Sequence, residues 1–201
     1  MREYIIACIP PAEVAARAIA MSQALQRRGG LFVLDKTRER PHVTLYYTIL
    51  PSGVLHIVRE RLARIATAME RPLLVATRFA RQERWIDVEY ESHAALVTLQ
   101  RAVIEAVNPL RAGHLRARDA ARLPRALPEV RQNIEQYGYR SVGALYRPHL
   151  TLTRMANDDD GGVLPVEELE HFSCVPAAIG LFAAGAHGTC VRLLSTFALR
   201  S

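Results

Sequence analysis

Two six-residue stretches of this chain are nearly identical: Arg40-Pro41-His42-Val43-Thr44-Leu45 and Arg147-Pro148-His149-Leu150-Thr151-Leu152. Each stretch, with the residues that follow it, is rich in the β-branched, aromatic and aliphatic residues typical of strands. We therefore predict one strand over residues 41–50 and another over residues 145–153. Each strand is built around the same motif.

Side chains alternate between the two faces of a strand, so every second residue of a motif points the same way. One face of the first strand then carries Arg40, His42, Thr44 and Tyr46. The matching face of the second carries Arg147, His149, Thr151 and Thr153. The aliphatic residues between them are expected to enter the core, which leaves an imidazole and a hydroxyl together on the opposite side of each strand.

The order of elements around the motif also repeats. Residues 40–91 are expected to contain the motif strand, a helix and a β-hairpin, and residues 145–200 the same three elements. Such a repeat indicates internal duplication. We predict an α+β fold: a single bilobal domain over residues 1–201, with two antiparallel sheets and outer helices around a central cleft.

Two segments lie outside these units. Residues 3–9 are expected to form a first strand, and a helix with apolar residues at helical spacing follows Pro10 and Pro11. The basic connector between the units, about residues 109–142, is rich in arginine and interrupted by prolines. It is expected to form a loop with one short helix, and to serve either as a lid or RNA-contacting arm or as a solvated linker.

Composition favours a globular, non-exported protein. Half of the 201 residues are apolar, which allows a sizeable core, and no apolar run is long enough to span a bilayer. Cys8, Cys174 and Cys190 lie in apolar stretches without metal-ligand spacing, which indicates buried free thiols in a reducing compartment. We expect a cytoplasmic monomer with no membrane partner.

The formal net charge is +6, and Lys36 is the only lysine among 26 lysine and arginine residues. A basic surface attracts phosphate-bearing ligands, and guanidinium groups match the geometry of phosphate oxygens. A solvated basic surface without a ligand accounts for the same composition, so charge alone does not decide between these interpretations.

His42 and His149, facing one cleft, suit displacement at a phosphodiester. One neutral imidazole accepts a proton from the nucleophile while the other, protonated, donates one to the leaving oxygen. An ordinary pKa of about 6.5 lets both forms coexist near neutral pH. The hydroxyls of Thr44 and Thr151 are placed to donate to the phosphate oxygens where negative charge builds up. This chemistry needs no metal and no cofactor.

The paired His-x-Thr-aliphatic motifs resemble those of the 2H phosphoesterase superfamily. The opening stretch, residues 4–10, resembles its bacterial 2′-5′ RNA ligase and RNA 2′,3′-cyclic phosphodiesterase branch. The resemblance implies a bilobal fold and metal-independent hydrolysis of cyclic phosphates on RNA ends or small cyclic nucleotides, sometimes with 2′-5′ RNA ligase activity. It also implies that His42 and His149 are the acid and the base, in either order, and that Thr44 and Thr151 bind phosphate.

Other residues are weaker candidates. Arg40 and Arg147 share the histidines' face and are placed to bind phosphate, and Tyr46 is placed to stack on a base, although strand ends carry such residues without any ligand. Trp85 is expected to pack in the core or between the lobes. Residues 158–162, three aspartates and two glycines, are typical of a turn rather than a metal site. The remaining histidines are expected on the surface: His56, His93, His114, His171 and His187.

Two other functions fit the same motifs. A non-catalytic nucleotide- or RNA-binding module would keep the cleft without turnover. An enzyme that opens cyclic oligonucleotide or cyclic ADP-ribose-type signals would use the same chemistry with different recognition outside the motif. The motif does not encode the substrate.

Overall fold

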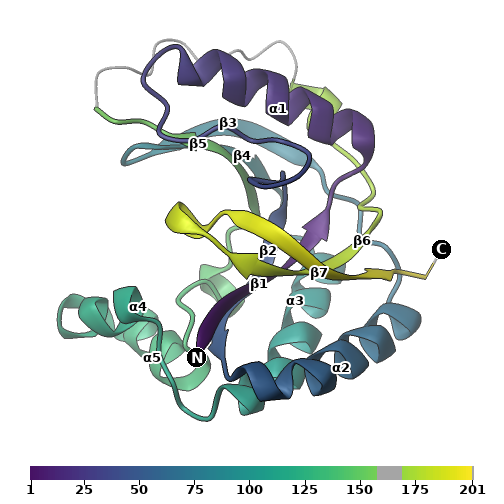
Figure 1. Cartoon of the computed structure of the whole chain (residues 1–201), viewed down its shortest axis with the longest axis vertical. Coiled ribbons are helices and arrows are strands. Elements are labelled where there is room, and N and C mark those ends of the chain that lie inside the picture. The colour runs from purple at the N-terminus through teal and green to yellow at the C-terminus, as the bar shows by residue number, and fades with distance from the viewer. Residues whose placement is uncertain (158–168, 201) are drawn as a thin grey trace.

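The computed structural model describes residues 1–157 and 169–200 of the chain, and the turn predicted at 158–162 lies outside them. Two antiparallel sheets form its centre, one of four strands in the order β2-β1-β6-β7 and one of three in the order β3-β4-β5. Helices lie on the outer sides of the sheets (Figure 1). The predicted α+β class, with two antiparallel sheets and outer helices, is confirmed.

The four-stranded sheet joins both ends of the chain. Its strands are β1 (Arg2–Ile9), β2 (Val43–Leu50), β6 (Ala178–Ala184) and β7 (Cys190–Ala198). Two helices pack against it below the sheet in Figure 1: α2 (Leu55–Ala68) and α3 (Ala94–Val107). Both helices bury an apolar stripe at helical spacing, as a helix that covers one face of a sheet must.

The three-stranded sheet consists of β3 (Ala76–Gln82), β4 (Trp85–Tyr90) and β5 (His149–Arg154). Helix α1 (Ala12–Gln26) lies over this sheet at the top of Figure 1 and packs against β5. It starts directly after Pro11, which cannot continue β1 and is favourable beside a helix start.

Each motif strand lies in the same sheet as the hairpin of the other repeated unit. The first motif strand, β2, lies in the sheet that contains the second unit's hairpin, β6-β7. The second motif strand, β5, pairs with the first unit's hairpin, β3-β4. Each lobe therefore combines a motif strand from one unit with a hairpin from the other, which holds the two motif strands next to the boundary between the sheets.

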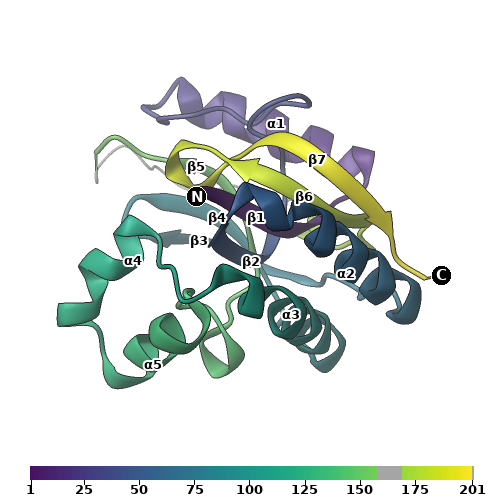
Figure 2. The same ribbon diagram turned by 60° about the horizontal axis from the view of Figure 1, so that its bottom comes forward.

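The connector contains two short α-helices rather than the one predicted. They are α4 (Ala117–Arg122) and α5 (Pro128–Tyr137). Pro128 occupies the first position of α5, where proline favours a helix start instead of breaking one. Figure 2 shows both helices beside the sheets. The short 3₁₀ turns of the described chain are Ser52–Val54, Asn108–Arg111, Leu123–Arg125, Gly143–Leu145, Leu169–Phe172 and Ala186–Gly188.

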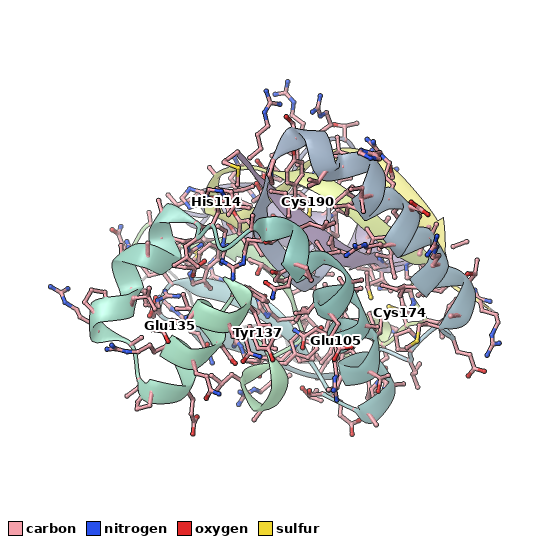
Figure 3. All side chains as sticks on the ribbon, turned by 90° about the horizontal axis from the view of Figure 1, so that it is seen from below. Glu105, His114, Glu135, Tyr137, Cys174 and Cys190 are labelled. Carbon is pink, nitrogen blue, oxygen red and sulfur yellow. The ribbon has the colours of Figure 1, made fainter. Side chains whose placement is uncertain are left out.

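Buried Arg111 links two parts of the connector. Its guanidinium donates to the carbonyls of His114 at 2.6 Å, Glu135 at 3.4 Å and Gln136 at 3.3 Å. The last two carbonyls belong to the final turn of α5, where backbone acceptors lack helical partners. Figure 3 shows Glu135 on α5, the helix next to α3. The end of α5 is thus held next to the turn that follows α3.

One hydrophobic core spans both sheets and includes Cys8, Cys174 and Cys190. All three cysteines are buried and free, as the sequence predicts. Among residues 1–157 and 169–200, no helix has the length and apolar character that a bilayer crossing requires.

Candidate active site

A β-bulge at Leu45 interrupts the first motif strand. Thr44 and Tyr46 pair with consecutive residues of β1, so Leu45 between them has no partner in the ladder. One extra residue shifts the alternation of side chains by one position. As a result Thr44 and Tyr47 line the central cavity.

The prediction that Tyr46 shares the face of His42 is wrong, because the bulge turns its side chain away from the cleft. Tyr46 is fully buried. Its hydroxyl donates to the carbonyl of Tyr137 at 2.6 Å and lies 3.1 Å from Oδ1 of Asn108. Tyr46 is therefore an anchor for the end of α5 and offers no surface to a base.

The second motif strand has the same bulge, at Leu152. Thr151 and Thr153 pair with consecutive residues of β4, which leaves Leu152 unpaired. Thr151 lines the cavity, whereas Thr153 is buried and donates to the carbonyl of Phe32 at 2.8 Å. The predicted shared face therefore ends at Thr151, at the same motif position as in the first strand.

Both motifs meet at one cavity of about 370 Å³. Its walls include His42 and Thr44 from the first motif and His149 and Thr151 from the second. This is the juxtaposition that strand alternation predicts. The volume is at the lower end of the range for small-molecule sites, which suits a single nucleotide or the end of a strand.

The two histidines are held in the same way. Nδ1 of His42 lies 2.8 Å from the carbonyl oxygen of Arg40, and Nδ1 of His149 lies 2.7 Å from that of Arg147. A carbonyl only accepts hydrogen bonds, so Nδ1 carries a proton in each ring. In the neutral form, Nε2 then has the free lone pair that proton transfer needs.

The electrostatic surroundings of His42 favour its neutral form. Burial lowers the pKa of His42 to about 4; the hydrogen bond to Arg40 opposes this shift and the charge of His149 adds to it. At pH 7 His42 is therefore unprotonated on Nε2 and able to accept a proton.

The two threonines differ in their hydrogen bonds. The Thr151 hydroxyl donates to Oδ1 of the buried Asp87 at 2.7 Å. In the described part of the chain, no hydrogen bond engages the hydroxyl of Thr44. A hydroxyl has one proton to donate. Thr44 is therefore the free donor of the pair, and Asp87 orients Thr151.

Arg147 lines the cavity next to His149, as predicted, and two buried carboxylates hold it. Nη2 lies 3.2 Å from Oδ2 of Asp87, and Nη1 pairs with Glu89. Burial raises the pKa of Glu89, but bonds from Arg78 and Arg147 outweigh it and keep the pKa below its ordinary value. Arg147 is thus fixed in one orientation while 31% of its side chain stays exposed to the cavity.

Arg40 does not lie in the cavity, so the prediction that it shares the face of His42 is wrong. Strand β2 begins at Val43, and Arg40 lies before it in irregular chain, outside the ladder with β1. Its Nε donates to the carbonyl of Thr37 at 3.4 Å.

The aromatic end of the cavity was not predicted from the sequence, since Trp85 was expected in the core or between the lobes. Trp85 and His187, at the tips of the two hairpins, line it, and their ring centroids lie 6.3 Å apart. Phe32 stacks against His187 behind them, at 6.0 Å. His187 is exposed, as predicted, but hairpin tips from different halves of the chain come together only in the folded protein.

The connector contributes a wall of the cavity, where the sequence left open a lid or RNA-contacting arm or a solvated linker. Arg116 lies over the ring of Tyr47, with its guanidinium carbon 3.7 Å from the ring centroid. The arginines of this region that line the cavity are Arg116, Arg118, Arg122 and Arg140. The arginine-rich composition was a signal, but it fits a solvated linker equally well.

Comparison with known proteins adds a family to this geometry. A family model described as "Protein of unknown function (DUF1045)" matches residues 52–175. The chain belongs to the DUF1045 family. The matched segment contains the second motif of this DUF1045 member and begins after the first. No curated protein sequence matches the chain significantly.

Several solved structures share the fold of this DUF1045 chain over its whole length. LigT of Escherichia coli in complex with phosphate has 18% sequence identity and a TM-score of 0.61, covering 100% of this chain and 98% of LigT. The protein TT0787 of Thermus thermophilus has 19% identity and a TM-score of 0.60, covering 100% and 99%. A protein described only as a phosphoesterase has 17% identity and a TM-score of 0.61, covering 100% and 99%. At the level of the fold, the predicted resemblance to 2H phosphoesterases is confirmed.

Proposed function

We propose that this protein is a cyclic phosphodiesterase that opens 2′,3′-cyclic phosphates on RNA ends or small nucleotides by two-histidine acid–base catalysis. The observation that carries the proposal is the matched pair His42 and His149. Each ring is fixed through Nδ1 by a backbone carbonyl, and both side chains line one cavity. Two such imidazoles supply the base and the acid that displacement at phosphorus requires.

The lowered pKa of His42 favours it as the base. His42 takes a proton from water while the water oxygen bonds to phosphorus. The bond from phosphorus to one ribose oxygen breaks, and protonated His149 gives its proton to that oxygen. Exchange with solvent then returns both rings to their starting states. Thr44 and Arg147 donate to the phosphate oxygens that gain charge.

The same groups could open the ring with a different nucleophile. If a ribose 5′-hydroxyl replaces water as the nucleophile and the 3′ oxygen leaves, the product has a 2′-5′ link. Ligation is therefore a second activity of the proposed site. The fold neighbours support the choice of nucleotide substrates, since LigT has been crystallised with 3′-AMP, NADP⁺ and ATP.

The test uses adenosine 2′,3′-cyclic phosphate and an oligoribonucleotide that ends in this group. His42→Ala and His149→Ala are each expected to lower kcat by about 10²–10⁴-fold. His114→Ala, which removes an exposed histidine outside the cavity, is the matched control and is expected to stay at the wild-type rate. Turnover within tenfold of wild type in either cavity variant contradicts the mechanism.

A second substrate separates the roles of the two histidines. Bis(4-nitrophenyl) phosphate has a leaving group that needs no proton, so replacing the acid is expected to cost little with it. The defect of His149→Ala should shrink on this substrate, and that of His42→Ala should not. Activity that is lost with EDTA and restored by a divalent metal, or tight binding without product, overturns the proposed function.

A further inference from the structure

Three arginines from the connector region line the cavity opposite the motif strands. Arg118 and Arg122 are four residues apart on α4, which places them on one face of the helix. Arg140 follows α5 and lines the same cavity. Figures 1 and 2 both show α4 and α5 together at one side of the sheets. These charges therefore come from a different part of the chain than the histidines.

No carboxylate of the described residues forms an ion pair with Arg118, Arg122 or Arg140. The nearest acidic residue in sequence, Asp119, is buried and pairs with Arg116 at 2.5 Å. The other buried carboxylate of the cavity, Asp87, is engaged by Thr151 and Arg147.

The three arginines also repel one another. Partial burial and the positive charges of Arg122 and Arg118 lower the pKa of Arg140, and the charges of Tyr139 and Asp119 oppose this shift only in part. Like charges four residues apart destabilise a helix, so this arrangement has a cost in the free protein. An anion between the guanidinium groups would remove the repulsion and form charge-assisted hydrogen bonds.

We propose that Arg118, Arg122 and Arg140 form a subsite for a second phosphate group of the substrate, separate from the cyclic phosphodiester at His42 and His149. The motif side has its own guanidinium, Arg147, for the reacting phosphate. The substrate class is then a cyclic phosphodiester that carries another phosphate, either a terminal monoester or the next diester of an RNA chain.

The inference rests on the proposed function for its choice of substrates. Three substrates separate the cases: adenosine 2′,3′-cyclic phosphate, the same compound with a 5′-phosphate, and a diadenylate with a free 5′-hydroxyl that ends in the cyclic phosphate. A 5′-phosphate is expected to raise kcat/KM at least about tenfold, mainly through KM. A larger gain for the diadenylate than for the 5′-phosphate identifies an RNA diester as the second group.

The variants are Arg118→Ala/Arg122→Ala and Arg140→Ala. They should abolish the advantage of the second phosphate and change kcat/KM for the 5′-hydroxyl mononucleotide less than about threefold. Arg125→Ala, on the same connector but outside the cavity, is the control and should keep the advantage. Equal losses on all three substrates would mean that the arginines bind the reacting phosphate, and would overturn the proposal.

A binding measurement decides the matter even if no cyclic substrate is turned over. Trp85 is the only tryptophan and lines the cavity, so its fluorescence reports on occupancy. Adenosine 2′,5′-bisphosphate is expected to bind at least about tenfold more tightly than 2′-AMP, and Arg118→Ala/Arg122→Ala should remove the difference. Equal affinities of the two ligands for the wild type, or a difference that persists in the double variant, overturn the subsite. If the wild type shows the difference and the variant loses it, but no cyclic substrate is turned over, only the proposed function is overturned.

Discussion

The hydroxyl of Thr151 donates a 2.7 Å hydrogen bond to Asp87, and Arg147 binds the same carboxylate at 3.2 Å. Asp87 lies directly opposite Thr151 in the ladder between β4 and β5. The carboxylate thus fixes two groups of the second motif at once. The first motif has no such partner for Thr44 in the described chain, so the two halves of the site are not equivalent.

Asp87→Asn is expected to lower kcat/KM about ten- to a hundredfold. The amide keeps the size of the side chain but loses the charge that orients Arg147 and the acceptor strength that holds Thr151. Steady-state kinetics on a 2′,3′-cyclic nucleotide measures the effect. Glu83→Gln is the control, because it neutralises an exposed carboxylate that also lines the cavity. A kcat/KM within twofold of wild type for Asp87→Asn would rule out the positioning role.

We expect kcat/KM to stay high well below pH 6.5. His42 must be neutral to act as base, and burial lowers its pKa to about 4, so the acidic limb is expected near pH 4. A limb near pH 6.5 that moves with substitution of His42 contradicts the assignment of the base.

The free energy of unfolding should also depend on the protonation of His42. Between about pH 6.5 and 4 the unfolded chain binds a proton at His42 that the folded chain does not, so the free energy of unfolding decreases as the pH falls through this window. His42→Gln removes this dependence, which urea unfolding at pH 7 and pH 4.5 detects. An unchanged pH dependence in His42→Gln would contradict the lowered pKa.

Tyr46→Phe should lower the free energy of unfolding by about 1–2 kcal/mol, because the partly buried carbonyl of Tyr137 loses its donor. Its effect on turnover should be small, since Tyr46 does not line the cavity. Tyr47→Phe is the matched change on the cavity side. The Tyr47 hydroxyl donates to Glu3, whose side chain is partly exposed, so water can solvate this carboxylate when the bond is lost. A loss of activity without loss of stability in Tyr46→Phe would restore it as a site residue.

Gln100→Leu tests the support of the first bulge. The buried Gln100 amide donates to the carbonyl of Leu45 at 3.2 Å and to that of Ser141 at 2.8 Å. Loss of both bonds leaves the buried carbonyl of Leu45 and the partly buried carbonyl of Ser141 without this donor, and is expected to cost about 1–3 kcal/mol in urea unfolding. Gln132→Leu on the exposed side of α5 should change stability by less than about 0.5 kcal/mol.

Much of the fold follows from local pattern. Helical spacing and β-branched runs predict the order of strands and helices, because these signals depend on neighbouring residues alone. The connector was predicted less well. Pro128 breaks one local pattern and starts another helix, and Arg111 holds that helix from a distance in sequence.

The site was predicted as far as alternation holds. His42 and Thr44 lie before the first bulge, and their counterparts in the second motif lie before the second, so all four face the cavity. Beyond each bulge the side chains point to the opposite face from the one predicted, so Tyr47 lines the cavity in place of Tyr46. A bulge depends on the partner strand and on a distant donor such as Gln100, neither of which the motif contains.

Local sequence is enough to predict that two copies of one motif form strands with a histidine and a threonine on the same side, because alternation is a property of the extended backbone. The surroundings of these side chains depend on tertiary packing. Exchange of hairpins brings Asp87 beside Thr151, and packing of the connector turns Arg118, Arg122 and Arg140 toward the cavity. These relationships join residues that are distant in the chain, and only the burial of a common core brings them together.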